Sequence, residues 1–170
     1  MVIIRAATEA DAAAIAALMN HELATTTTEW SDVPHTADDV APWIRDHECV
    51  LVADVDGALA GFVAYGWFRG GTSKPGYRFT VETSVRIAPE HRRSGVGRDL
   101  MRALVAEAKA ARKHVLVAAI DGSNERAIAF HASLGFVEVG RMPELGTKLG
   151  QWLDLVLMQL VLDDCPPPPA

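Results

Sequence analysis

The chain has 170 residues, of which 49% are hydrophobic and 22% charged, with 16 Lys and Arg against 22 Asp and Glu, a formal net charge of −6. This composition is that of one globular domain, and its acidic balance argues against nucleic acid as a partner, because binding to nucleic acid requires phosphate neutralisation. No apolar run could span a bilayer, the N-terminus lacks the order of a secretion signal, and the two cysteines, Cys49 and Cys165, are expected to be free thiols. We therefore expect a cytoplasmic protein without membrane association.

The first half of the chain predicts a strand, two helices and a hairpin. Thr8 and Thr36 have the character of helix N-caps, and Asp56-Gly57 is a strong two-residue hairpin turn. Between the two helices, the threonine-rich stretch 21–34 reads as a loop or broken helix that either covers a site or simply connects. The expected elements are a strand at 2–5, helices beginning after Thr8 and Thr36, and hairpin strands at 50–55 and 58–67.

The second half alternates strands and helices. A loop with several glycines leads into it, and the unbroken apolar run at 115–120 is typical of a central strand covered on both faces. Strands are expected at 79–87, 115–120, 136–142 and 151–162, with helices over 100–112 and 124–134. This order predicts a mixed α/β sheet with helices on both faces, in one domain over 1–162 followed by a disordered proline-rich tail at 163–170.

The turn after the strand at 79–87 has the chemistry of an anion site. Its sequence, from Arg92 to Gly97, is RRSGVG, and it opens a helix. Small residues let a ligand approach the backbone, and the free N–H groups of a helix start, together with arginines, favour a pyrophosphate-like group. The alternative is a plain tight turn, since glycine pairs before helices are common. Neither a nucleoside triphosphate loop nor a dinucleotide fingerprint is present.

Two motifs in order resemble the Gcn5-related N-acetyltransferase (GNAT) superfamily. The first is R-x-x-G-x-G at 92–97, and the second is N-x6-H-x3-G-F at 124–136. Thr80-Val81-Glu82, Trp152-Leu153-Asp154-Leu155 and the loop ending in Trp30 are similar to the phosphinothricin and methionine sulfoximine N-acetyltransferase group. The likeness runs from Ile3 to Leu162 and implies the GNAT fold, a mixed sheet of about seven strands with about four helices.

The resemblance implies that acetyl-CoA is the cosubstrate, and the residues themselves indicate that no metal is required. Acetyl-CoA would lie where the strands at 79–87 and 115–120 splay apart, with its pantetheine arm along the first strand and its pyrophosphate on the N–H groups of 93–98. The six histidines show no metal-ligand spacing. The implied cofactor-binding residues are Val85, Arg86, Ile87, Arg92, Arg93, Ser94, Gly95, Val96, Gly97, Arg98 and Asn124, although Asn124 could equally be only an N-cap.

Two residues are the catalytic candidates. Glu82 is expected to be the general base, directly or through water, and His131 stands where many family members protonate the leaving thiolate with a tyrosine. A backbone N–H near Val85 would polarise the carbonyl. The alternatives are a surface carboxylate paired with Arg69 or Arg78, and a helix histidine that is hydrogen-bonded for structure.

The implied substrate is a small amino acid of the phosphinothricin or methionine sulfoximine kind, acetylated on its α-amino group by direct attack. Its binding residues would be Arg69, Arg78, Thr83 and Lys148, although each cation could be an ordinary solvated charge. The loop at 68–77 is longer than is usual in the family, which leaves the identity of the substrate open, but not the reaction. Two rivals remain: an acetyltransferase for another amine (a polyamine, an aminoglycoside or a protein N-terminus), and a non-catalytic acetyl-CoA-binding module. A homodimer through the C-terminal strands would use Leu153, Leu155, Leu157 and Leu160.

Overall fold

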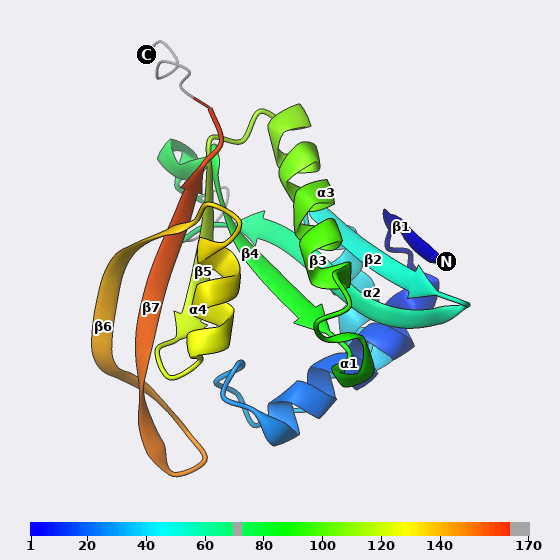
Figure 1. Cartoon of the computed structure of the whole chain (residues 1–170), viewed down its shortest axis with the longest axis horizontal. Helices are drawn as coiled ribbons and strands as arrows, with labels where there is room; N and C mark the ends of the chain where they lie inside the picture. Colours follow the sequence, from blue (N-terminus) through cyan, green and yellow to red (C-terminus); the bar gives the residue numbers. More distant parts are fainter. Residues whose placement is uncertain (70–72, 164–170) are drawn as a thin grey trace.

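The computed structural model describes residues 1–69 and 73–163. Its strands and helices follow the predicted order, and the sheet order is β1-β2-β3-β4-β5-β7-β6 (Figure 1). Gly70 and Gly71 of the predicted loop, Cys165 and the predicted tail from 164 lie outside the described residues. The strands are β1 (Val2–Ala6), β2 (Cys49–Val55), β3 (Ala58–Trp67), β4 (Thr80–Ile87), β5 (Val115–Asp121), β6 (Val137–Lys148) and β7 (Gln151–Val161), and the helices are α1 (Ala12–Thr25), α2 (Ala37–Asp46), α3 (Val96–Ala110) and α4 (Glu125–Ala132).

Local sequence signals account for most element boundaries. Thr36 caps α2 by accepting a hydrogen bond from the Asp39 N–H at 3.2 Å. Asp56 and Gly57 have φ of 53° and 86°, the left-handed pair that a tight hairpin turn requires. The prediction for 21–34 was partly wrong, because α1 continues to Thr25 and the loop begins only at Thr26. Leu23 is buried against the core, so tertiary packing extends the helix beyond its polar residues.

The sheet holds one parallel pair, β4 with β5, among antiparallel neighbours. The pair is in register only from Thr80 opposite Val115 to Thr83 opposite Ala118. Beyond this point β4 runs on to Ile87 and β5 to Asp121 without pairing with each other. The two strands therefore diverge and leave an opening in the middle of the sheet.

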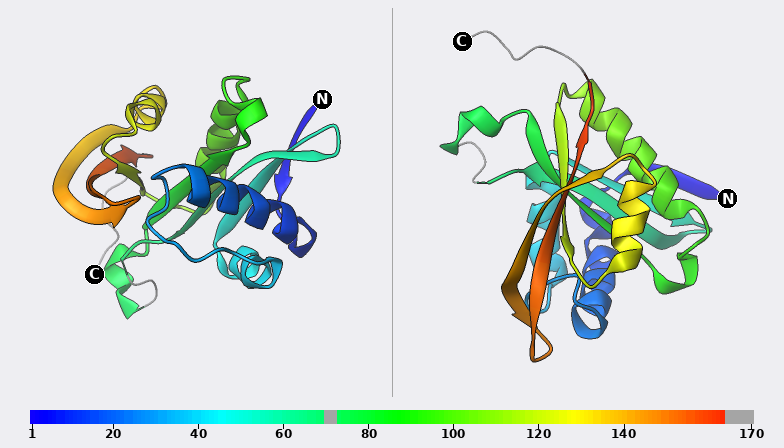
Figure 2. Two further views of the ribbon diagram at one scale, coloured as in Figure 1. Left: turned by 90° about the horizontal axis from the view of Figure 1, so that it is seen from below. Right: turned by 60° about the vertical axis from the view of Figure 1, so that its left-hand side comes forward.

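Helices cover both faces of the sheet and divide the core in two. Residues of α3, such as Leu100 and Leu104, pack against β4, β5 and β7 on one face, and Ile15 of α1 and Val40 of α2 pack on Phe62 on the other. Figure 2 shows α1 and α2 below the sheet and α3 and α4 above it. Within the described residues, no helix has both the length and the apolar character needed to cross a membrane.

Candidate active site

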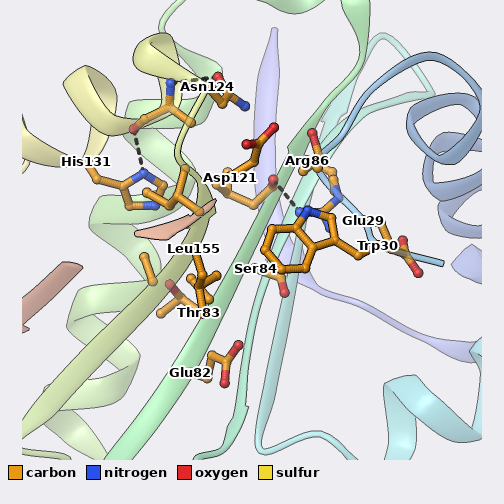
Figure 3. Close-up of a pocket in the computed structure, with 16 residues that line it drawn as sticks. Glu29, Trp30, Glu82, Thr83, Ser84, Arg86, Asp121, Asn124, His131 and Leu155 are labelled. Atoms are coloured by element: carbon orange, nitrogen blue, oxygen red, sulfur yellow. Dashed lines mark hydrogen bonds between the residues drawn. The ribbon is translucent and has the colours of Figure 1, made fainter. Parts of the chain in front are cut away.

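The opening between β4 and β5 contains a cavity of about 290 Å³ (Figure 3). Both strands contribute to it at the point where their pairing ends, and the loop after α1 and the first turns of α4 complete the wall. Such a position, at the carboxyl ends of parallel strands, is where α/β sheets bind ligands. The lining residues are Thr28, Glu29, Trp30, Glu82, Thr83, Ser84, Val85, Arg86, Ala118, Ala119, Ile120, Asp121, Asn124, Ala127, His131 and Leu155.

The free edge of β4 faces this opening. On its other side, β4 pairs with β3, where Val85 lies opposite Val63 and Ile87 opposite Gly61. The groups of Val85 and Ile87 that point away from β3 have no strand opposite them, so their N–H groups can pair with an extended ligand, as an added strand would. Their carbonyls already accept hydrogen bonds within the protein: that of Val85 from the Arg86 guanidinium at 3.1 Å, and that of Ile87 from Arg92 Nε at 3.3 Å.

The turn between β4 and α3 is shaped by two left-handed residues. Arg93 has φ of 68° and Gly95 has φ of 97°, and a side chain at Gly95 would meet no atom within 4 Å. The start of α3 is therefore open, and a helix start of this kind attracts anions. The Ser94 N–H already donates to the His91 carbonyl, and the Arg98 N–H donates to the Gly95 carbonyl.

Gly97 is constrained by close packing rather than by its backbone conformation. A Cβ there would lie 3.3 Å from Ile87 Cγ1 and 3.5 Å from Phe130 Cζ. A larger residue would push the first turn of α3 away from β4 and α4. Glycine is therefore required at the two positions for different reasons: Gly95 shapes the turn, and Gly97 lets the helix lie close to the opening.

Glu82 lies at the end of the opening where β4 and β5 are still paired, in register with Val117 of β5. Within residues 1–69 and 73–163, no hydrogen bond or ion pair uses its carboxylate. Its side chain is exposed to the opening, yet nearby protein displaces enough water to raise the pKa of the carboxyl above its usual range. An unpaired carboxylate with a raised pKa has the properties of a general base.

His131 reaches the cavity from α4 and is only 4% exposed. Its Nδ1 lies 2.8 Å from the Ala127 carbonyl, which can only accept, so Nδ1 carries the proton and Nε2 has a free lone pair. Burial lowers the pKa of His131, which favours the neutral form. Asn124 caps α4 through a hydrogen bond of 3.1 Å from the Ala127 N–H to its Oδ1, and it also lines the cavity.

The loop after α1 closes one side of the cavity. The Thr27 hydroxyl donates to Asp121 at the end of β5, and the Trp30 indole N–H donates to the Thr27 carbonyl at 3.0 Å. The Trp30 ring lies on Gly146 of β6, where any added Cβ would overlap it. The loop is thus attached to both β5 and β6, although it follows a helix on the far side of the opening (Figures 1 and 3).

Of the four residues predicted to bind substrate, Thr83 lines this cavity and the three cations do not. Arg69 and Arg78 are exposed outside its lining, and the Arg78 guanidinium lies over the Phe79 ring, 4.5 Å from its centroid. The Thr83 hydroxyl donates to the Val117 carbonyl at 3.2 Å. Lys148 is buried, and its ammonium donates to the Ser31 carbonyl and to Asp32, the latter at 2.8 Å.

Sequence reasoning missed two acidic residues of the cavity. Asp121 is 5% exposed and accepts hydrogen bonds from Thr27 and from the hydroxyl and N–H of Ser123. A signal was present, because a polar residue directly after a buried strand marks the strand's carboxyl end. Glu29, 2.8 Å from His35 Nε2, had no such signal, since it lies in a polar loop.

Comparisons with known proteins identify the family of the chain. The chain is 42% identical to the L-amino acid N-acyltransferase MnaT of Escherichia coli over 98% of both chains. It is 40% identical to the L-methionine sulfoximine/L-methionine sulfone acetyltransferase of Salmonella typhimurium, again over 98% of both. The yncA protein of Salmonella typhimurium, solved with its cofactor acetyl-CoA, superposes with a TM-score of 0.94 at 38% identity, covering 100% of this chain and 99% of that one. The sequence model of the acetyltransferase (GNAT) family matches residues 15–136, and the chain belongs to this family.

Proposed function

We propose that this protein is an acetyl-CoA-dependent N-acetyltransferase that acts on the α-amino group of a small amino acid. The observation that carries the proposal is the opening between β4 and β5, which joins an unpaired strand edge to a cavity lined by Glu82 and His131. The names of the relatives, an amino-acid acyltransferase and a methionine sulfoximine acetyltransferase, support the same reaction.

In this proposal, acetyl-CoA lies along the free edge of β4. Its pantetheine arm pairs with the backbone at 85–87, Asn124 contacts it from α4, and its pyrophosphate lies at the open turn at 92–98. The turn supports this role because Gly95 leaves its surface uncovered and Arg93 adds positive charge. The thioester would then lie near the end of the paired segment, beside Glu82.

Glu82 takes a proton from the substrate ammonium, directly or through a water molecule. The freed amine nitrogen attacks the thioester carbonyl carbon, the C–S bond breaks as the tetrahedral intermediate collapses, and the thiolate leaves. His131 in its neutral form has no proton on Nε2, so it must first accept one from the attacking nitrogen before it protonates the thiolate. This order refines the expectation that His131 acts as an acid.

The cavity favours a small amino acid over larger amines. Its volume of about 290 Å³ is closed on one side by Trp30, which leaves little room for an aminoglycoside or a polypeptide. Phosphinothricin and methionine sulfoximine are the substrates we infer, with Arg69 and Arg78 as outer cations that would attract them. Free Cys49 accords with action in the cytoplasm.

We also infer a homodimer, through the β6–β7 hairpin. The prediction named Leu153, Leu155, Leu157 and Leu160 as its surface. It was wrong for Leu153, which is 3% exposed in the single chain, while the other three leucines are partly buried. The exposed large apolar side chains of the hairpin are instead Val137, Val139, Met142, Leu145, Leu149, Trp152 and Val161. Light scattering of the purified protein tests the inference, and a monomer at micromolar concentration contradicts it.

The test of function is release of free thiol from acetyl-CoA, measured with purified protein against a panel of amines. The panel includes phosphinothricin, methionine sulfoximine, methionine sulfone, polyamines, aminoglycosides and a peptide with a free N-terminus. We expect the highest kcat/KM with the amino acids. Activity with polyamines or aminoglycosides alone would overturn the proposal that the substrate is an amino acid. Binding of acetyl-CoA without turnover of any amine would indicate a non-catalytic sensor.

A further inference from the structure

An amino-acid substrate presents two opposite charges to its enzyme, and this inference rests on the function proposed above. The ammonium and the carboxylate both lose water on entering a closed cavity, and each then needs an opposite charge or hydrogen bonds in return. A cavity for a free amino acid should therefore contain at least one cation, whereas a cavity for a plain amine needs none.

The cavity lining has several anions and one cation. Among the described lining residues, the carboxylates are Glu29, Glu82 and Asp121, and Arg86 is the single lysine or arginine. The cations expected from the sequence are elsewhere: Arg69 and Arg78 are exposed outside the lining, and Lys148 is bonded to the loop. If the cavity itself holds a carboxylate, Arg86 is the residue available to bind it.

Arg86 lies on the same face of β4 as Glu82, because side chains two and four residues apart in a strand point the same way. Its side chain is 13% exposed, and its position is set by two contacts. Nη1 donates to the Val85 carbonyl at 3.1 Å, and Nε lies 2.9 Å from Glu22 Oε2. No hydrogen bond within the described residues uses Nη2, so this end of the guanidinium remains available to a ligand.

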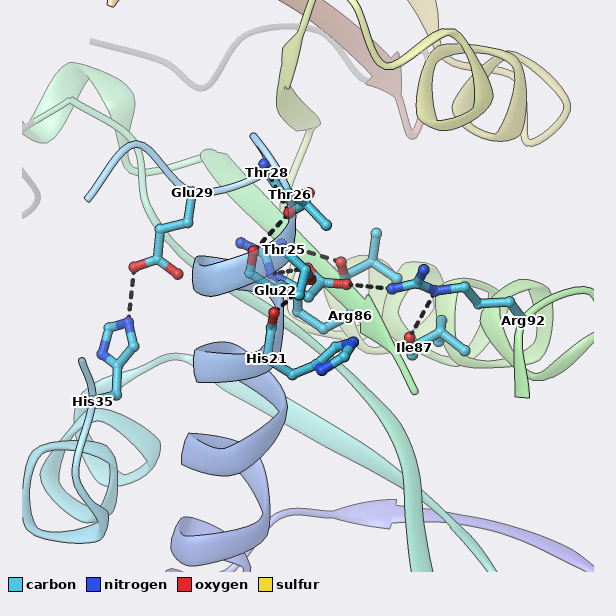
Figure 4. Close-up of polar contacts among 11 residues, drawn as sticks. His21, Glu22, Thr25, Thr26, Thr28, Glu29, His35, Arg86, Ile87 and Arg92 are labelled. Carbon is cyan, nitrogen blue, oxygen red and sulfur yellow. Dashed lines mark hydrogen bonds and ion pairs between the residues drawn. The ribbon is translucent and has the colours of Figure 1, made fainter. Parts of the chain in front are cut away.

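Glu22 of α1 is the partner that holds Arg86, and it serves a second arginine as well (Figure 4). Its other oxygen, Oε1, accepts a hydrogen bond of 3.3 Å from Arg92 Nη2, while Arg92 Nε donates to the Ile87 carbonyl at 3.3 Å. One carboxylate thus faces two guanidinium groups, which leaves the cluster with a net charge of +1. Arg86 Nε and Glu22 Oε2 are close but not aligned for a hydrogen bond, so Glu22 does not use all the hydrogen-bonding capacity of Arg86.

We propose that Arg86 binds the α-carboxylate of the amino-acid substrate and that Glu22 is the positioning residue that orients it. The guanidinium faces the substrate from the α1 side of β4, and the acidic residues of the cavity receive the ammonium. Selectivity for amino acids over simple amines then comes from a residue on the same strand as the candidate base. If the ion pair between Arg86 and Glu22 only stabilised the fold, removing it would not change this selectivity.

The test compares two substrates that differ only in the charge that Arg86 is proposed to bind. L-Methionine sulfone carries an α-carboxylate, and its α-carboxamide carries a neutral group of nearly the same size. The measured quantity is the ratio of kcat/KM for the acid to kcat/KM for the amide, at saturating acetyl-CoA. Because it is a ratio, it does not depend on the fraction of folded enzyme.

In Arg86→Met we expect this ratio to fall by about 10- to 100-fold, the usual worth of a hydrogen bond to a charged group. The matched control is Arg45→Met, which removes an exposed arginine of α2 that pairs with Glu9 and should leave the ratio unchanged. If Arg86→Met fails to fold, Glu22→Gln/Arg86→Met removes both buried charges of the pair and gives the same comparison. A wild-type ratio in either variant overturns the proposal.

The role of Glu22 is tested by non-additivity. Glu22→Gln should change the ratio when Arg86 is present and have no effect on it in the Arg86→Met background. An equal change in both backgrounds overturns the positioning role. If wild-type protein acetylates neither methionine sulfone nor any other amino acid of the panel, the proposed function itself fails, a result distinct from an intact activity whose selectivity ignores Arg86.

Discussion

The two sides of the opening are built in different ways. Apart from Asn124, the side that we assign to the cofactor is one continuous stretch, from the end of β4 through the Gly95 turn to the start of α3, and its features belong mainly to the backbone. The side that we assign to the amine is assembled from side chains of distant segments. Thr27 contacts Asp121, which is 94 positions away in the sequence, and Lys148 contacts Ser31, which is 117 positions away. A continuous backbone motif can be recognised in sequence, whereas a surface of long-range contacts cannot.

This difference also implies that the two sides can be altered independently. A change in the turn should affect the binding of acetyl-CoA alone, and a change in the loop or in β6 should affect the binding of the amine alone. Glu82 lies where the two sides meet, at the end of the paired part of β4 and β5. Its replacement should therefore impair turnover without affecting the binding of acetyl-CoA.

The largest effect is expected for Glu82→Gln, which removes the base while keeping its shape. We expect kcat to fall by at least about 100-fold, the usual contribution of general base catalysis, with an unchanged Kd for CoA by calorimetry. In wild-type protein kcat/KM should rise with pH through the raised pKa of Glu82, because the ionised form is active, and this limb should disappear in the variant. Glu90→Gln, on the exposed turn after β4, is the control. An unchanged kcat would show that another group takes the proton.

The next largest effect is expected for Gly146→Ala, on the amine side. A Cβ at this position overlaps the Trp30 ring, so the indole must move and the loop with it. Since a displacement of about 1 Å can reduce a rate about 100-fold, kcat/KM for the amino acid should fall by roughly 10- to 100-fold while the KM for acetyl-CoA stays the same. Gly140→Ala on the same strand, where a Cβ meets no atom within 4 Å, is the matched control. An equal rise in both KM values would contradict independent sides.

A smaller effect, confined to the cofactor side, is expected for Gly95→Ala. A non-glycine residue in the left-handed region costs roughly 1–2 kcal/mol, which should distort the turn and raise the KM for acetyl-CoA by about tenfold. Gly57→Ala, in the β2–β3 hairpin, introduces the same type of strain at φ of 86° and also has no atom within 4 Å. Both variants should lose similar unfolding free energy in urea, and only the first should bind acetyl-CoA more weakly. Equal binding in the two would exclude the turn from the cofactor site.

The element order was predictable because each element has a local cause. Capping by Thr36, the Asp56-Gly57 turn and the apolar run of β5 are all visible over a few residues. The end of α1 was not, since polar residues from His21 onward suggest a loop, and only the burial of Leu23 extends the helix. Local patterns thus define the kind of element better than its limits.

The turn that we assign to the cofactor could be recognised in the sequence, because Gly95 and Gly97 lie in one motif. On the amine side, Lys148 was expected to bind substrate, but it is bonded to the loop at Ser31 and Asp32, a pairing that sequence spacing cannot reveal. The error at Leu153 has a different cause: β7 is apolar on both faces, so the period-two alternation that separates buried from exposed residues is hidden.

The smallest effect is expected for His131, which lies between the two sides. It is an effect on the pH dependence of stability, so it can be measured without any substrate. The imidazole is buried, donates from Nδ1 to Ala127 and packs edge-on against Phe136, with ring centroids 5.2 Å apart. Burial lowers its pKa in the folded state, so the unfolded chain binds a proton more readily than the folded one. The stability that this difference provides is fully present above the unfolded value of about 6.5 and is lost as the pH falls below it.

We therefore expect the unfolding free energy of wild-type protein to decline between pH 7 and pH 5, measured by urea denaturation, and to decline less steeply in His131→Gln. Identical slopes in wild type and His131→Gln would mean that folding does not lower the pKa of the imidazole, and a steeper decline in the variant would mean that folding raises this pKa, so that the imidazole is protonated in the folded protein at neutral pH. In that case Nε2 would already carry a proton, and His131 could protonate the thiolate without first accepting one from the amine.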